Sequence, residues 1–125
     1  MVIPIPDNIS DKVAAMFEPM SVGLHAVLRQ PPEDGDHVLV IGGGMIAYTI
    51  IAAIRMLGID CEITQLSLLD FQKKVGENLG VNHGLTNKQD LNAYPIQGAT
   101  NQSLVTVYFL VDSMQFTTVL EAKYI

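Results

Sequence analysis

The hydrophobic pattern along the chain alternates between short continuous apolar runs and longer stretches with helical spacing. Residues 38–41 form a short continuous apolar run, and residues 103–111 are rich in β-branched and aromatic side chains, which is typical of strands inside a sheet. Residues 61–66 predict a second strand after the first, and residues 81–85 predict a short third one. Because helical stretches separate the runs, the pattern predicts the α/β class, with a parallel sheet in the order 3-2-1-4 and flanking helices.

The helices predicted between these strands differ in how much of their surface is apolar. The stretch that follows the first strand and ends near Leu57 is apolar almost all round, so it should lie buried against the sheet, with Gly58 ending it. The next helix should begin at Ser67 as its cap, with Gln72 facing water. The apolar residues that should form its buried face are Leu68, Phe71, Val75 and Leu79.

The remaining segments predict shorter elements. Ser10 or Asp11 can cap a short helix, and Pro19 suits the first turn of a second one that runs to about Arg29. A brief helix over residues 88–94 and a last helix over residues 115–123 complete the expected elements.

Composition and charge exclude several classes of function. The 125 residues include 13 acidic and 7 basic ones, a formal charge of −6, which argues against binding to nucleic acid or to an anionic membrane surface. The longest apolar stretch is too short to span a membrane. The single cysteine, Cys61, cannot form an internal disulfide and is expected to be a small buried hydrophobe. These features favour a cytoplasmic protein.

Three consecutive glycines between the first strand and its helix carry the candidate chemistry. The residues Gly42-Gly43-Gly44-Met45-Ile46-Ala47 fit the G-x-G-x-x-A form of the dinucleotide-binding motif. Gly42 would allow a tight turn, Gly44 would let a pyrophosphate approach the backbone, and Ala47 would allow close packing of helix on strand. The amides of Met45 and Ile46, at the positive end of the helix, would hold the phosphates. The alternative is a glycine-rich turn that binds nothing.

Four stretches of the sequence resemble the coenzyme-binding portion of the zinc-type medium-chain alcohol and polyol dehydrogenases. They are "EPMSVGLHAV" (18–27), "DGDHVLVIGGGMIA" (34–47), "FQKKVGENLGVNHGLTN" (71–87) and, more loosely, "VYFLVDSMQFTTVLEA" (107–122). The resemblance implies a Rossmann-like fold, with a helical segment at residues 1–30 leading into a partial NAD(P)-binding domain at residues 31–125. It also implies that the last strands of the sheet and the catalytic domain are missing.

The resemblance also assigns cofactor contacts beyond the glycines. In members that use NAD, an acidic residue at the end of the second strand binds the adenosine ribose, and that place falls on Gln65, with Ser67 two residues on. A neutral residue there would not repel a 2′-phosphate, so NADP is slightly favoured over NAD. Val111 would lie at the nicotinamide side, next to Asp112, where the family usually has glycine.

The zinc chemistry of the family has little support in this chain. The resemblance puts Glu18 close to the catalytic zinc, while the zinc ligands of the family lie in the missing domain. The three histidines His25, His37 and His83 share no metal-ligand spacing and are expected to be structural or exposed. Zinc is therefore expected in the parent enzyme and not in this chain alone.

Two kinds of function remain open. The first is the nucleotide-binding part of an NAD(P)-dependent dehydrogenase that transfers hydride between nicotinamide and a small alcohol or polyol, with this chain alone inactive. The second is a stand-alone dinucleotide-binding module, or a degenerate Rossmann module that binds nothing, in either case without catalysis. Because the fourth strand would expose an apolar edge, a homo-oligomer is expected in either case.

Overall fold

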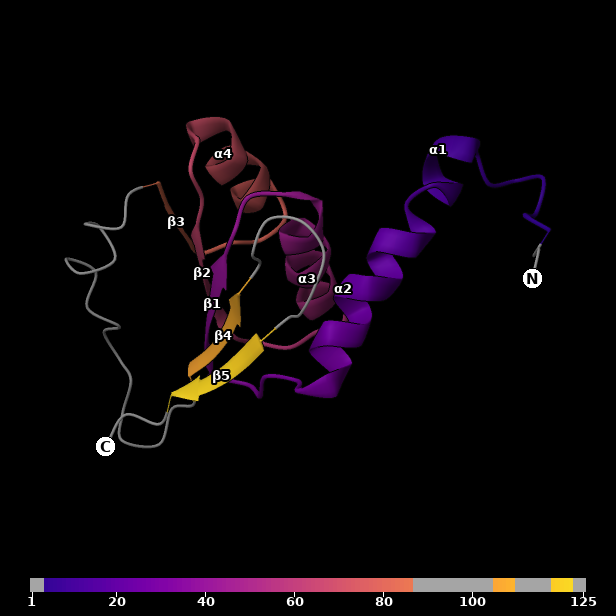
Figure 1. Cartoon of the computed structure of the whole chain (residues 1–125). Helices are drawn as coiled ribbons and strands as arrows, with labels where there is room; N and C mark the ends of the chain where they lie inside the picture. The colour runs from indigo at the N-terminus through magenta and orange to yellow at the C-terminus, as the bar shows by residue number, and fades with distance from the viewer. Residues whose placement is uncertain (1–3, 87–104, 110–117, 123–125) are drawn as a thin grey trace.

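A computed structural model describes residues 4–86, 105–109 and 118–122 of the chain. The strands form one sheet in the order β3-β2-β1-β4-β5, and α2 lies against α3 beside it (Figure 1). The helices are α1 (Asp11–Ala14), α2 (Phe17–Arg29), α3 (Met45–Met56) and α4 (Asp70–Asn78), and the strands are β1 (His37–Ile41), β2 (Glu62–Leu66), β3 (His83–Leu85), β4 (Val105–Phe109) and β5 (Thr118–Ala122). The predicted α/β class with parallel strands is confirmed.

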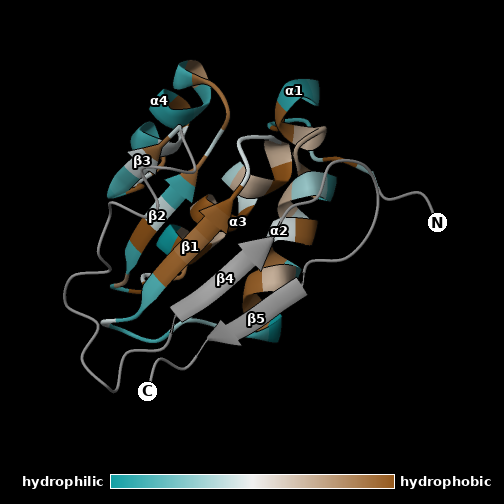
Figure 2. Cartoon of the chain, turned by 60° about the vertical axis from the view of Figure 1, so that its left-hand side comes forward, coloured by the Kyte–Doolittle hydropathy of each residue, from teal (hydrophilic) through white to brown (hydrophobic). Residues whose placement is uncertain are grey.

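The centre of the sheet is β1, which pairs in parallel with β2 on one side and β4 on the other. His37 lies opposite Glu62 of β2 and Val105 of β4, and Ile41 lies opposite Leu66. Figure 2 shows the hydrophobic colour along most of β1, as expected for a strand in the middle of a parallel sheet. The carboxyl ends of β1 and β2 therefore meet at one edge of the sheet.

The predicted helix over residues 115–123 is wrong, because β5 runs antiparallel to β4 in that region. Val105 lies opposite Ala122 in this pairing. The β-branched Thr118 and Val119 favour a strand, and the free edge of β4 offers unpaired backbone groups that a helix could not satisfy. Since β5 covers this edge, the reason given for a homo-oligomer is also wrong, and the oligomer itself stays a prediction. The predicted helix over residues 88–94 lies outside the described residues.

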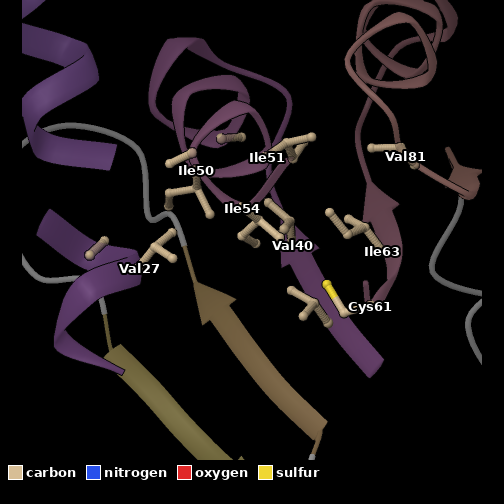
Figure 3. Packing of buried hydrophobic residues seen from close by; sticks show 12 residues of the cluster. Val27, Val40, Ile50, Ile51, Ile54, Cys61, Ile63 and Val81 are labelled. Carbon is tan, nitrogen blue, oxygen red and sulfur yellow. The ribbon is translucent and has the colours of Figure 1, made fainter. Parts of the chain in front are cut away.

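The core is built around α3, whose burial on most sides is confirmed. Its Ile50, Ile51 and Ile54 have no exposed surface and contact residues of the sheet and of α2 (Figure 3). The cluster of buried apolar residues consists of Ala26, Val27, Val38, Val40, Ala47, Ile50, Ile51, Ala53, Ile54, Cys61, Ile63 and Val81. This packing fixes where the first turn of α3 begins.

Helix α2 approaches α3 closely at one glycine. A Cβ added to Gly23 would collide with the side chain and the carbonyl carbon of Thr49. Thr49 is itself buried, and its hydroxyl donates a hydrogen bond to the carbonyl of Ile46 at 2.9 Å. The close approach explains why a glycine stands inside α2, where it costs helix stability.

The predicted start of α4 is wrong, and so is most of its predicted buried face, although Leu79 packs against the core as expected. Leu68, Phe71 and Val75 are 86%, 63% and 38% exposed, whereas Gly76 is the buried position of the helix. Ser67 does not cap α4, because its N–H donates to the carbonyl of Leu85 at 2.8 Å and continues the sheet. The side chain of Gln72 accepts instead from the N–H groups of Leu68 and Leu69, and the helix begins at Asp70.

Cys61 is buried in the core as expected. Its thiol lies beneath α3 in Figure 3, and burial raises the pKa of the thiol above its ordinary value. A raised pKa leaves less of the reactive thiolate at pH 8. We expect iodoacetamide to alkylate Cys61 at least about 100-fold more slowly in the folded protein than in urea. Equal rates in the two conditions, measured by mass spectrometry, would contradict the burial of this side chain.

Candidate functional site

The candidate site is the loop of three glycines at the carboxyl edge of the sheet. It joins the end of β1 to α3, which confirms the strand–turn–helix setting of the motif. Gly42 has a φ of 146°, a backbone conformation that favours glycine. Its N–H donates to the carbonyl of Leu66 at 2.8 Å, so the loop leaves the sheet beside the end of β2.

Gly44 is the N-cap of α3 and is exposed. Its φ of −102° and ψ of −176° describe extended backbone, which any residue can adopt. A Cβ built there would meet no atom within 4 Å in the part of the chain that the structure describes. Neither backbone conformation nor packing against these residues therefore requires glycine at this position, and the space above it is open.

The first turn of α3 contains Met45 and Ile46, which are predicted to hold the phosphates, and Ala47, which is predicted to allow close packing of helix on strand. In any α-helix, the N–H groups of the first turn have no acceptor within the helix and lie at its positive end. Met45 is exposed, Ile46 is partly buried, and Ala47 has no exposed surface. The exposed backbone near Gly44 and Met45 can therefore present donors to an anion.

Gln65 reaches the loop from inside the protein. It has no exposed surface, and its side-chain Nε2 donates to the carbonyl of Gly42 at 2.8 Å. Its Oε1 has no hydrogen-bond partner among the described residues. Ser67 is 3% exposed, and its hydroxyl donates to the carbonyl of Leu85 at 3.4 Å. Both residues predicted for the adenosine ribose therefore lie below the surface next to the loop.

Gln72 is a neighbour of the loop, although its position in the helical pattern predicted that it faces water. A Cβ added to Gly43 would lie 2.7 Å from the side-chain Oε1 of Gln72, so Gly43 gives this side chain its room. The hydroxyl of Tyr48 in α3 donates to the backbone carbonyl of Gln72 at 3.3 Å. The sequence contained an indication of this contact. The dinucleotide motif explains Gly42 and Gly44, but it does not explain why a glycine stands between them.

The residues with metal-binding side chains do not gather near the loop. Glu18 is exposed in the first turn of α2, and no group of three His, Cys, Asp or Glu side chains suited to a metal occurs within residues 4–86. His25 is exposed on the same helix. Val111 lies outside the described residues, so its predicted nicotinamide contact is not placed.

Two histidines come together at the opposite edge of the sheet. His37 Nδ1 lies 3.1 Å from one carboxylate oxygen of Glu62, and His83 Nε2 lies 3.2 Å from the other. Neighbouring strands put these residues side by side, since His37 pairs with Glu62 in the sheet register. Both histidines are partly buried, so a structural role fits them.

Comparisons with known proteins support the resemblance, although no family model matches the chain. The (R,R)-butanediol dehydrogenase of Neisseria gonorrhoeae is 44% identical over 64 residues, which are 51% of this chain and 18% of that protein. The L-idonate 5-dehydrogenase of Vitis vinifera is 34% identical over 91 residues, 70% of this chain and 25% of that protein.

A solved structure shows the same relation in three dimensions. The crystal structure of L-idonate 5-dehydrogenase from Escherichia coli matches with a TM-score of 0.61 and 28% identity, over 70% of this chain and 25% of that one. The chain spans only about a quarter of the length of these proteins. In sequence and in fold, it is related over this span to the zinc-type medium-chain alcohol and polyol dehydrogenases.

Proposed function

We propose that this chain is the nucleotide-binding part of a zinc-type, NAD(P)-dependent alcohol or polyol dehydrogenase of the cytoplasm. The dinucleotide pyrophosphate would lie over Gly44, Met45 and Ile46 at the start of α3. The single observation that carries this proposal is the open space at Gly44, where a glycine serves no purpose in the surrounding described structure. A glycine of this kind is what close approach of a ligand to the backbone requires.

The phosphate end of a dinucleotide fits the residues present. Gly44 and Met45 are exposed, and the positive end of the 12-residue helix α3 attracts an anion without any basic side chain. In the whole enzyme, the bound nicotinamide would accept hydride from the carbon that carries the hydroxyl of a small alcohol or polyol. The role of this chain is to bind and orient the phosphates and the adenosine.

The adenosine end supports NADP slightly over NAD. Gln65 carries no charge, so nothing at the end of β2 repels a 2′-phosphate as a carboxylate would. Asp70 is exposed at the start of α4 and opposes this preference. The ribose would lie at the sheet edge near Gln65 and Ser67.

Zinc does not fit the described residues of this chain. A catalytic zinc site takes three protein ligands, and among the described residues Glu18 belongs to no group of three metal-binding side chains. We therefore propose that the zinc ligands and the cleft that binds the alcohol belong to other parts of the parent enzyme, and that this chain alone does not oxidise alcohols.

A second function is favoured by one observation. The side chains of Gln65 and Ser67 are buried and hydrogen-bonded within the chain, so neither offers an exposed group to a ribose. This arrangement suits a stand-alone or degenerate nucleotide-binding module that holds a dinucleotide mainly by its phosphates.

Titration of the purified chain with NADPH and with NADH tests the proposed function. We expect saturable heat of binding for both, with a Kd below about 1 mM, which corresponds to about −4 kcal/mol, and tighter binding of NADPH. Inorganic pyrophosphate should compete with both, because the shared contact is at the helix start. A folded chain that releases no heat with either dinucleotide would contradict the proposal.

A further inference from the structure

We propose that Gln65 is the positioning residue of the glycine loop, and that its buried amide, held in place by the glycine at position 76, sets the geometry of the phosphate site. This inference rests on the proposed function, since the loop is taken to bind a dinucleotide phosphate. It differs from a ribose contact, because Gln65 would act on the ligand only through the loop.

Only a donor can occupy the position of the Gln65 amide nitrogen. Nε2 lies 2.8 Å from the carbonyl oxygen of Gly42, and a carbonyl oxygen accepts hydrogen bonds. An ionised glutamate of the same shape would place a negative oxygen against that carbonyl, inside a site with no exposed surface. In this arrangement the bond to the Gly42 carbonyl depends on a donor at position 65, which an ionised carboxylate does not supply.

Gly42 is hydrogen-bonded to β2 through both its N–H and its carbonyl group. The N–H of Gly42 donates to Leu66 of β2, and its carbonyl accepts from the side chain of Gln65, the neighbouring residue on β2. Both peptide groups that flank Gly42 are thereby fixed to the end of β2. Two residues later the chain reaches Gly44 and the exposed start of α3, so the Gln65 bond orients the backbone that meets the phosphates.

Gly76 makes room for the other end of the same amide. A Cβ added to Gly76 would collide with Oε1 of Gln65 and would lie 2.9 Å from its Cδ, while the side chain of Val81 is 3.3 Å away. Gly76 stands inside α4, where glycine lowers helix stability. Glycine at this position is accounted for by the Gln65 side chain, which would otherwise be pushed out of line with the Gly42 carbonyl.

If Gln65 and Gly76 are paired, the effect of Gly76→Ala on the thermal midpoint should change sign when Gln65 is also replaced. Gly76→Ala should lower the thermal midpoint of the wild-type chain, because the new methyl group displaces the Gln65 amide. In the Gln65→Ala variant, the same change should raise the midpoint, because the space is empty and alanine favours the helix. A Gly76→Ala effect of the same sign in both backgrounds would overturn the pairing.

The positioning role is tested by dinucleotide affinity in variants that remain folded. Gln65→Ala, Gln65→Glu and Gly76→Ala should each weaken NADPH binding about tenfold or more at pH 8, below their thermal midpoints. Val81→Ala is the matched control, since it removes a buried neighbour of Gly76 but leaves the bond to Gly42 intact, and it should bind like the wild type. Gln65→Glu that binds like the wild type would overturn the proposal, because its shape is kept and only the donor is lost.

Amide chemical shifts separate this inference from the proposed function. In NMR spectra without ligand, the N–H signals of Gly43 and Gly44 should move in the Gln65→Glu and Gly76→Ala variants and stay in place in Val81→Ala. If the wild type binds no dinucleotide, the proposed function fails while these shifts still report on the loop. If the two signals are the same in all variants, the positioning role is wrong whatever the chain binds.

Discussion

Replacing Gly44 with valine is expected to lower the affinity for NADPH at least about 100-fold, which is about 2.7 kcal/mol, while the chain stays folded. The extended backbone at Gly44 accepts any residue, and the new Cβ meets no described atom of the protein within 4 Å. The branched side chain would then fill the space above the first turn of α3, where the phosphates would lie. Calorimetric titration measures the affinity, and a circular-dichroism melt shows that the fold is kept.

Two further variants make the Gly44 result specific. Gly44→Ala adds a single methyl group and should cost less affinity than valine does. Lys74→Val puts the same β-branched side chain at an exposed position of α4 and should leave both affinity and fold unchanged. Unchanged affinity in a folded Gly44→Val chain would mean that no phosphate approaches the backbone at this glycine.

Local pattern was enough to predict the centre of the molecule. Strand β1 and helix α3 were foreseen because a continuous apolar run and an almost wholly apolar helix have few arrangements other than burial in a sheet. The glycine loop could be foreseen because its residues are adjacent in the sequence. Gly42 has a φ of 146° in the turn after β1, and Gly44 is the N-cap of α3.

The errors arose where contacts between distant segments outweigh the local pattern. Apolar spacing on α4 predicted a buried face through Phe71, but the helix turns Gly76 to the sheet because Gln65 occupies the space there. The helix predicted over residues 115–123 is replaced by the pairing of β5 with β4. In both cases the structure of the segment depends on a residue or strand that is distant in the sequence, and a single sequence does not show such contacts.

The sequence indicated where in the fold the residues of the candidate site lie, but it did not indicate which groups their side chains contact. The end of β2 was expected beside the glycine loop, and Gln65 does lie there, yet the direction of its side chain depends on the room left by Gly76. The pairing of His37 and His83 around Glu62 likewise follows from strand register rather than from spacing along the chain. Sequence periodicity gives the face of an element, while hydrogen-bond partners need the register.

The second large effect is expected from Arg55, which ties the end of α3 to the turns around β2 and β3. Its guanidinium donates to the carbonyl of Gly80 at 3.0 and 2.8 Å and to the carbonyl of Cys61 at 2.9 Å. It also donates to the side chain of Asn82 at 2.8 Å, which in turn accepts from the N–H of Ile63 of β2. One side chain therefore satisfies the backbone of two turns and positions a third group.

We expect Arg55→Met to lower the free energy of unfolding by about 3 kcal/mol, because methionine keeps the apolar stem but leaves partly buried carbonyls without a donor. Urea denaturation measures the loss. Arg55→Lys should be intermediate, since one ammonium group cannot reproduce the fork of the guanidinium. Arg29→Met, at the exposed end of α2, is the matched control and should change stability by less than about 0.5 kcal/mol. If Arg55→Met lowered the free energy of unfolding no more than Arg29→Met, water would replace these hydrogen bonds without loss. The turns after α3 and α4 would then owe their geometry to the positive-φ glycines Gly58 and Gly80 alone.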